Sequence, residues 1–387
     1  MFSEPVRAWF TSSFPAPTKA QELGWPAIAA GDDALILAPT GSGKTLTAFL
    51  WGIDRLLTTP PPEGPARTRI LYVSPLRALA VDIEKNLRSP MVGIAHAAER
   101  LGHPVQAPTV GMRTGDTPPT ERRRLVRHPP DLLITTPESL YLMLTSAARE
   151  TLANVEAVII DEIHALAATK RGSHLALTLE RLNNRCERPP QRIGLSATQR
   201  PLEEIATFLG GFDVVGEEPP KRRPVTIVDA GMRKTLEIEV VVPVEDMGAL
   251  GTPQKSIWPS MHPKLLELVQ EHRSTLIFVN ARRLAERLAT RLNELVAEAA
   301  QAEDGEGGET GFGAGFGIGA GDGGELVMAH HGSLSRERRL VIEDDLKAGR
   351  IKGLVATSSL ELGIDMGAVD LVIQVESPGA VSRGLQR

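Results

Sequence analysis

ALILAPTGSGKT, residues 34–45, is an apolar run that leads into a glycine-containing loop, and the residues after it, 46–57, favour a helix. The glycines allow the backbone to curl so that successive N–H groups and the positive helix end point at one anion. In such a loop Lys44 reaches the β- and γ-phosphates of a nucleotide, and Thr45 offers its hydroxyl to Mg²⁺. Ala38 departs from the general pattern, which begins with glycine, and an ordinary glycine-rich turn is the alternative. We predict a nucleoside triphosphate site formed by Thr40, Gly41, Ser42, Gly43, Lys44 and Thr45.

The composition is that of a soluble globular protein, with 42% hydrophobic and 24% charged residues among 387. The length suits two domains. No apolar run approaches the roughly 20 residues that span a bilayer, and residues 1–10 lack the pattern of a secretory signal, so we expect a cytoplasmic protein without a membrane partner. Cys186 is the single cysteine, which excludes internal disulfides. The net charge of -5 does not by itself indicate nucleic-acid binding.

Short apolar runs of strand length alternate with helical segments along the whole chain. The runs are apolar on both faces, as in parallel strands covered by helices on each side. Polar or glycine residues follow them, at the strand ends where such sheets bind ligands. We therefore predict an α/β fold with mostly parallel sheets, whose strands lie at residues 69–73, 131–135, 157–160, 193–195, 275–279, 326–329, 354–356 and 371–375.

The strand runs fall into two series. We predict a first domain over residues 1–220, a linker over 221–260 that includes an extended strand at 235–242, and a second domain over 261–387. Residues 301–324 are rich in glycine and acidic side chains and cannot bury enough apolar surface to offset their ordering entropy. We expect a flexible surface insertion there, with partner binding through Phe312 and Phe316 as the alternative.

DEIH, residues 161–164, directly follows an apolar strand. A carboxylate at such a strand end can hold Mg²⁺ beside a phosphate loop, and a second one can polarise the attacking water. We assign Asp161 to the metal and Glu162 to the base, although a lone Asp–Glu pair is usually a solvated turn. Ser196 and Thr198 close the next strand, where their hydroxyls could bond to His164 or Asp161 and sense the nucleotide.

The phosphate loop, DEIH and SAT (196–198), each at a strand end and in this order, resemble superfamily 2 helicases and translocases of the DEAD/DEAH type. The resemblance implies two tandem RecA-like domains of the P-loop NTPase fold with ATP and Mg²⁺ as cofactors. It implies a catalytic role for Lys44, Asp161, Glu162 and His164, and adenine recognition by Gln21. It also implies that strand-end segments grip a nucleic-acid backbone without reading bases, through Pro75, Arg77, Thr114, Gly115, Thr136 and Pro137.

In the second half, residues 276–283, 330–335 and 356–365 resemble the second motor domain. The resemblance implies that Asn280, Arg282 and Thr357 contact nucleic acid, and that Gly363 and Asp365 face the nucleotide. The adjacent histidines 330 and 331 point to opposite faces of a strand and have no third ligand nearby in sequence. We therefore expect no structural metal.

Several segments narrow the resemblance to the large helicase-related (Lhr) family: residues 14–25, 75–79, 256–259, 278–288 and 330–335. Membership would imply 3′-to-5′ movement on single-stranded DNA, unwinding of DNA or RNA:DNA duplexes, and a role in DNA repair. An RNA helicase remains an alternative, because backbone contacts do not settle the sugar. A nucleotide-gated clamp with little turnover is another, and a small-molecule kinase a distant third.

Two further features of the sequence are an arginine-rich run and the motif at the end of the chain. The arginine-rich run at 121–127 could line a nucleic-acid groove or form a solvated, ion-paired face. The last family motif begins with Gln-Arg, and the chain stops at Gln386 and Arg387. We expect this polypeptide to be a fragment without the following arginine fingers, which contribute on the order of 10³ to 10⁵ in rate in related enzymes. It should therefore hydrolyse ATP weakly.

Overall fold

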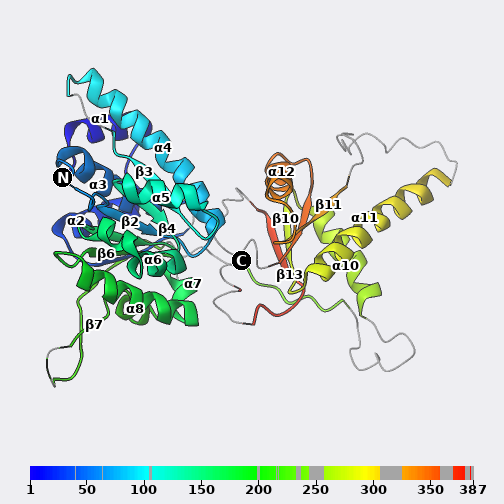
Figure 1. Cartoon of the computed structure of the whole chain (residues 1–387). Helices are drawn as coiled ribbons and strands as arrows, with labels where there is room; N and C mark the ends of the chain where they lie inside the picture. The colour runs from blue at the N-terminus through cyan, green and yellow to red at the C-terminus, as the bar shows by residue number, and fades with distance from the viewer. Residues whose placement is uncertain are drawn as a thin grey trace. The chain divides into compact units, whose positions relative to one another are not determined.

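The computed structural model describes residues 1–387 except 40, 63, 104–106, 198–200, 215, 217, 232–236, 244–256, 306–324, 358–368, 380–383 and 385–387. It divides into two compact units, Met1–Lys234 and Thr235–Arg387, and each is considered by itself (Figure 1). Among the described residues, no helix is both long and apolar enough to cross a membrane.

The first unit is built on a parallel sheet whose described strands follow the order β3-β4-β2-β5-β6-β1-β9. A short antiparallel pair, β7 with β8, lies apart from this sheet. The elements are α1 (Glu4–Ser13), α2 (Lys19–Ala30), β1 (Ala34–Leu37), α3 (Lys44–Thr58), β2 (Ile70–Val73), α4 (Arg77–Arg100), β3 (Val110–Arg113), α5 (Pro119–Arg127), β4 (Leu132–Thr135), α6 (Pro137–Leu144), η1 (Ala147–Leu152), β5 (Ala157–Ile160), α7 (Ile163–Ala167), α8 (Lys170–Arg185), β6 (Gln191–Ser196), α9 (Leu202–Gly210), β7 (Phe212–Asp213), β8 (Lys221–Arg222) and β9 (Thr226–Asp229).

Helices cover both faces of this sheet, which explains why its central strands are apolar throughout. Ile36 and Tyr72 point into a cluster formed with α1 to α4, whereas their neighbours Leu37 and Val73 point into a second cluster with α6 to α9. Figure 1 shows α1, α3 and α4 on one side of the strands and α6 and α8 on the other. Alternate residues of one strand therefore serve two separate cores.

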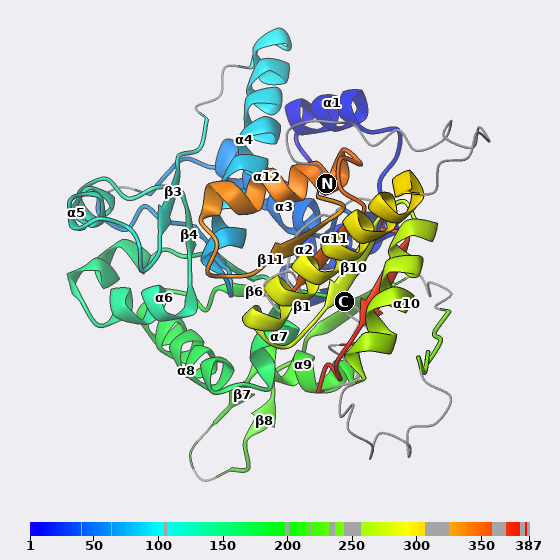
Figure 2. The ribbon, with the colours of Figure 1, turned by 90° about the vertical axis from the view of Figure 1, so that its right-hand side faces the viewer.

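The second unit has the same construction on a smaller scale. Its described strands follow the parallel order β11-β12-β10-β13. One face packs against α10 and α11 and the other against α12, and Figure 2 shows these helices from a second side. The elements are α10 (Trp258–Glu271), β10 (Thr275–Phe278), α11 (Arg282–Gly305), β11 (Val327–His330), α12 (Arg336–Lys347), β12 (Gly353–Ala356) and β13 (Leu371–Gln374).

The predicted α/β class with parallel sheets is confirmed, and three details need correction. Thr226–Asp229 forms β9 and pairs with β1, so this part of the expected linker belongs to the first sheet. The strand expected at 235–242 is not found in its described part, since residues 237–242 carry no regular structure. The expected insertion began at 301, but α11 continues to Gly305, and residues 306–324 lie outside the described part.

The buried carboxylate of Asp131 stabilises the start of β4 through hydrogen bonds. Asp131 is 5% exposed and receives hydrogen bonds from Arg67, at 3.0 and 3.2 Å, and from the N–H and hydroxyl of Thr109, at 2.8 and 2.7 Å. Burial raises the pKa of the Asp131 carboxyl, but these hydrogen bonds outweigh burial, and the net shift of the pKa is downward from 3.8. The ionised form of Asp131 therefore stabilises the fold.

Replacing Asp131 by asparagine is expected to lower the free energy of unfolding by about 1.5–3 kcal/mol at neutral pH, the range for hydrogen bonds to charged groups. Because the folded pKa lies below the unfolded one, this stability is present above about pH 4 and is lost as the pH falls through the folded pKa. Urea unfolding at several pH values measures it, with Glu99→Gln on the exposed face of α4 as the charge-matched control. A loss equal to the control's, or one independent of pH, would contradict this assignment.

Candidate nucleotide and nucleic-acid site

The predicted site residues of the first unit follow the carboxyl ends of parallel strands and so gather at one edge of the sheet. The strand order divides this edge into two halves. The neighbours β5, β6 and β1 lead into the residues predicted for the nucleotide, while β3, β4 and β2 lead into those predicted for nucleic acid. The sequence predicted the strand ends but not this division.

The loop between β1 and α3 has the backbone of a phosphate cradle. Gly43 caps the 15-residue helix α3 with φ +79°, in the left-handed region that favours glycine. A Cβ atom at Gly43 would lie 2.9 Å from Nε2 of Gln21. Gln21 is 3% exposed, and its Oε1 accepts a hydrogen bond from the Thr18 N–H at 2.9 Å. The structure thus brings Gln21 against the loop, and Gly41 (φ +77°), Ser42 and Thr45 complete its described part.

A buried ion pair joins the loop to the end of β5. Lys44 Nζ donates to Glu162 Oε1 at 3.2 Å, and both side chains are 7% exposed. The second oxygen of Glu162 lies 3.4 Å from Nε2 of His164. Glu162 also has φ +45°, the one non-glycine residue of the described chain with positive φ. Such strained backbone is characteristic of functional sites.

His164 connects this ion pair to the end of β6. The Ala197 N–H donates to Nδ1 of His164 at 3.3 Å, and the Ser196 hydroxyl lies 3.1 Å from the same atom. Because Nδ1 accepts a hydrogen bond, the neutral ring carries its proton on Nε2, the atom that faces Glu162. A continuous chain of contacts therefore runs from Lys44 through Glu162 and His164 to Ser196.

Asp161 has the surroundings of a site that needs a cation. It is 3% exposed, its Oδ2 accepts a hydrogen bond from the Tyr72 hydroxyl, and its Oδ1 accepts from the Glu162 N–H at 2.9 Å. Burial, and then the charge of Glu162, raises the pKa of the Asp161 carboxyl to about 6. A nearby divalent cation would offset both effects, and the carboxylate of Asp161 and hydroxyl of Thr45 are the oxygen donors that Mg²⁺ prefers.

Hydrogen bonds connect the segments that follow β2, β3 and β4. The Thr135 hydroxyl donates to the Arg113 carbonyl at 2.8 Å, which fixes the end of β4 against the end of β3. Arg171 donates to the Pro75 carbonyl at 3.0 Å and to Glu138 at 2.6 Å, which joins the β2 loop to α6. Gly115 is exposed. The other predicted residues of these loops are buried: Pro75, Thr114, Thr136 and Pro137.

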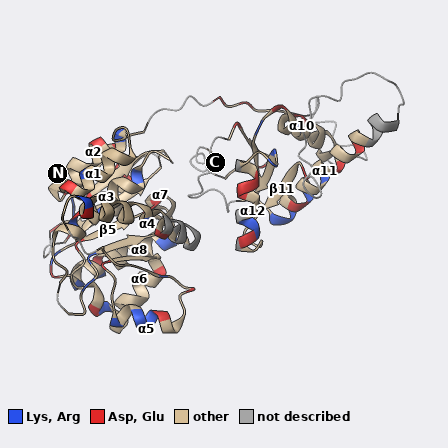
Figure 3. Cartoon of the chain, turned by 90° about the horizontal axis from the view of Figure 1, so that it is seen from above, with Lys and Arg blue, Asp and Glu red and all other residues tan. Residues whose placement is uncertain are grey.

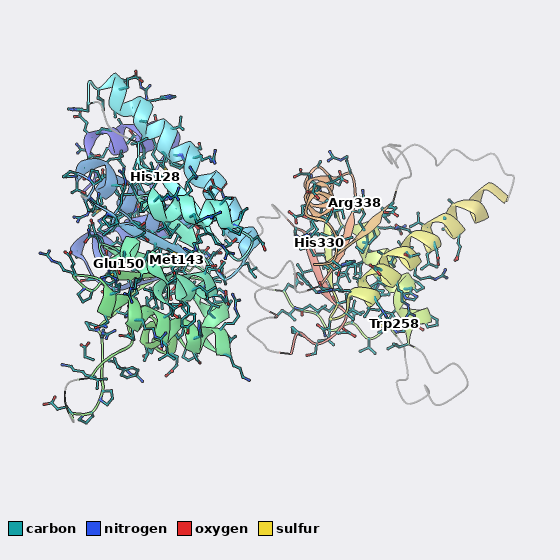
Figure 4. All side chains as sticks on the ribbon, in the orientation of Figure 1. His128, Met143, Glu150, Trp258, His330 and Arg338 are labelled. Atoms are coloured by element: carbon teal, nitrogen blue, oxygen red, sulfur yellow. The ribbon has the colours of Figure 1, made fainter. Side chains whose placement is uncertain are left out.

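In the second unit the corresponding residues also gather at strand ends. Arg282 donates to the Ser333 hydroxyl at 2.6 Å, and the Asn280 N–H donates to Glu376 at 2.9 Å. The Thr357 N–H donates to the His330 carbonyl at 3.3 Å. Figure 4 labels His330 on β11. It lies 3.0 Å from Glu343, and its neighbour His331 lies 2.9 Å from Glu286, so each histidine has its own carboxylate.

Several predicted residues lie outside the described part: Thr40, Thr198, Gly363 and Asp365, together with the Arg77 side chain. Within the described residues, no group of three or more His, Cys, Asp and Glu side chains is arranged to hold a metal ion.

Three residues of the site went unnoticed in the sequence, Tyr72, Arg171 and Glu376, while Ser333 was part of the 330–335 segment but was given no role of its own. Tyr72 sits inside an apolar run and Arg171 in a polar helix, where residues of these types are common. Ser333 and Glu376 belong to strand-end segments, a position that could have singled them out.

Comparisons with known proteins identify the class. The DEAD/DEAH box helicase model matches residues 18–205, and the helicase conserved C-terminal domain model matches residues 320–387. The solved structure of the Mycobacterium smegmatis helicase Lhr bound to ssDNA and AMP-PNP aligns with the whole chain at 54% identity and a TM-score of 0.78, over 45% of that protein. The chain belongs to the DEAD/DEAH-box helicases, and its two units are tandem RecA-like domains.

Among these proteins the chain is similar to the Lhr family over its whole length. It is 56% identical to the Lhr helicase/probable uracil glycosylase of Mycolicibacterium smegmatis. It is 42% identical to the ATP-dependent helicase Lhr-Core protein 2 of Thermococcus barophilus. The chain spans 25% of the length of the first relative and 42% of the second.

Proposed function

We propose that the chain is an ATP-dependent helicase and translocase core, which couples ATP hydrolysis to movement along single-stranded DNA and to the separation of DNA and RNA:DNA duplexes. The observation that carries this proposal is the division of the first sheet's edge between nucleotide residues and nucleic-acid residues. The whole-length similarity to a helicase solved with ssDNA and AMP-PNP supports DNA as the substrate. The proposed DNA repair role and cytoplasmic location rest on the family resemblance of the sequence.

The residues of the cradle fit ATP and Mg²⁺. The positive φ of Gly43 and the N-terminus of α3 present N–H groups to phosphate oxygens. ATP supplies the phosphoanhydride bond whose hydrolysis drives the motor. Lys44 binds phosphate oxygens, Thr45 and Asp161 hold Mg²⁺, and Gln21, which packs on Gly43, contacts the adenine. In the second domain, the residues proposed to contact the nucleotide are Gly363 and Asp365.

The ion pair of Lys44 and Glu162 suggests how nucleotide binding activates the base. While Lys44 donates to Glu162, that carboxylate is engaged by the ammonium and is not available to the attacking water. When Lys44 turns to phosphate oxygens instead, Glu162 is released to accept the proton of the attacking water. His164 then remains in contact with Glu162 and with Ser196, so a change at Glu162 is passed to the next strand end.

In this proposal, residues of both domains contact the sugar–phosphate backbone of the nucleic acid. In the first domain these are the strand-end residues Pro75, Arg77, Thr114, Gly115, Thr136 and Pro137. In the second they are Asn280, Arg282 and Thr357. Hydroxyls, amides and arginines of this kind bind phosphates and sugars and tolerate any base sequence.

Strand displacement tests the proposal. The chain, and a version extended past Arg387, are each mixed with a labelled duplex that carries a single-stranded 3′ tail, a 5′ tail or no tail, with ATP or AMP-PNP. We expect ATP-dependent displacement only from the 3′-tailed duplex. ATP hydrolysis that is stimulated by DNA without any displacement would contradict the helicase assignment and favour a nucleotide-gated clamp.

A further inference from the structure

A cationic pocket lies in the first domain, apart from the ATP-binding residues. Its volume is about 360 Å³, and it is bounded by the end of β3, one side of α5 and the residues 146–148. Four arginines line it, Arg113, Arg122, Arg123 and Arg127, with Val126 and Ser146 beside them. In Figure 3 α5 carries prominent basic segments, and Figure 4 labels His128 directly after α5 and Met143 and Glu150 on either side of residues 146–148. Among the described residues that line the pocket, none is acidic.

The arginines of the pocket differ from their neighbour on the same helix. Arg124 does not line the pocket and forms a two-pronged ion pair with Glu121, at 2.7 and 2.8 Å. Within the described part of the chain, the side chains of Arg113, Arg123 and Arg127 have no hydrogen-bonded or ionic partner. α5 therefore neutralises Arg124, which is not part of the pocket lining, and leaves Arg123 and Arg127 available.

Two of the four pocket arginines, Arg122 and Arg113, are associated with the end of β3 and the loop after it. Arg122 is held by the Gly115 and Thr117 carbonyls, each at 2.8 Å, so its position is set by the loop after β3. Arg113 is half-buried, and burial followed by the charge of Arg122 lowers the pKa of its guanidinium. Like charges held this close favour a bound anion, because an anion would relieve both the repulsion and the lost hydration.

We propose that this pocket binds a backbone phosphate of nucleic acid, on the outer side of edge strand β3. Guanidinium groups match phosphate oxygens in charge and in paired hydrogen bonds. Nucleic acid is favoured over a free anion because the pocket adjoins the predicted nucleic-acid loop: Arg113 directly precedes Thr114, and Arg122 bonds to Gly115. Val126 adds an apolar wall that suits a sugar. The proposal rests on the proposed function and extends the path of the strand beyond β4 and β3.

The salt dependence of DNA binding tests the pocket. The pocket variant is Arg123→Gln with Arg127→Gln, both exposed on α5 and therefore tolerant of substitution. The control variant, Arg88→Gln with Arg124→Gln, removes the same charge from exposed arginines that pair with Glu84 and Glu121. Affinity for labelled oligodeoxythymidylate is measured by fluorescence anisotropy at several salt concentrations in AMP-PNP.

We expect the pocket variant to lose affinity on the order of tenfold relative to the control variant. The slope of log K against log salt should fall by about 0.7 for each lost phosphate contact. Equal slopes for the two variants would overturn the pocket while leaving the proposed function intact, provided that wild type and control bind DNA. If neither binds, the proposed function fails and the pocket proposal with it. Titration with pyrophosphate distinguishes a nucleic-acid phosphate from a free phosphate ligand. If wild type binds pyrophosphate, the pocket variant does not, and the salt slope of DNA binding is the same in both, the ligand of the pocket is a free phosphate compound and not nucleic acid.

Discussion

Replacing Glu162 by glutamine is expected to lower the rate of ATP hydrolysis by about 10²- to 10⁴-fold, the contribution of a positioned general base. Glutamine has nearly the shape of glutamate but cannot take a proton from water. Glu162 is buried, held in a left-handed backbone conformation, and linked to both Lys44 and His164, so the neighbouring Asp161 cannot replace it without rebuilding the loop. Binding of ATP should persist, since Lys44 is then no longer occupied by a carboxylate.

Glu156→Gln is the matched control for this variant. Glu156 lies just before the opposite end of β5, where it pairs with Arg69 at 2.7 Å, far along the strand from the phosphate loop. We expect this control to change stability and to leave turnover close to wild type. Steady-state hydrolysis and nucleotide binding are measured on both variants. A Glu162→Gln protein that turns over ATP within a few-fold of wild type would rule out Glu162 as the base.

Replacing Lys44 by alanine should remove ATP binding and also destabilise the nucleotide-free protein. A lost charge-assisted contact to the transferring phosphoryl group costs about 10²- to 10³-fold in turnover. The buried Glu162 carboxylate would also lose its cationic partner, and breaking a buried ion pair in this way costs about 3–5 kcal/mol. Thermal unfolding without nucleotide measures the second effect, and equilibrium binding of a fluorescent ATP analogue measures the first.

A double variant separates these two effects. Lys44→Met combined with Glu162→Gln removes both charges together, so no unpaired ion is left in the interior. We expect it to recover most of the stability lost by Lys44→Ala and none of the hydrolysis. If the double variant were as unstable as the single one, the ion pair would not account for the stability that Lys44 provides.

The sequence allowed much of the fold to be predicted because buried parallel strands must be apolar on both faces. β1, β2, β4, β5 and β6 have this property and stood out as short runs. β3 did not, since it lies at the sheet edge, is only half-buried and contains Gly111. β9 was mistaken for linker because its residues are mostly exposed, so its pairing with β1 left no hydrophobic pattern.

The site could be predicted as a set of residues but not as an arrangement. Spacing after the strands pointed to Lys44, Glu162 and His164, because parallel strands end at a common edge. Their mutual contacts join residues 118 positions apart, in the case of Lys44 and Glu162, and depend on a strand order that no local pattern encodes. The hydrogen bond from Tyr72 to Asp161 and the free arginine face of α5 arise for the same reason from long-range packing.

The most direct measurement is the steady-state rate of ATP hydrolysis by this chain with and without saturating single-stranded DNA, alongside single-stranded RNA and the Glu162→Gln variant. We expect that DNA raises the rate, that the increase exceeds any caused by RNA, and that Glu162→Gln abolishes it. A rate that DNA leaves unchanged, although ATP is bound, would contradict the coupling of the two halves of the sheet edge on which the proposed motor depends.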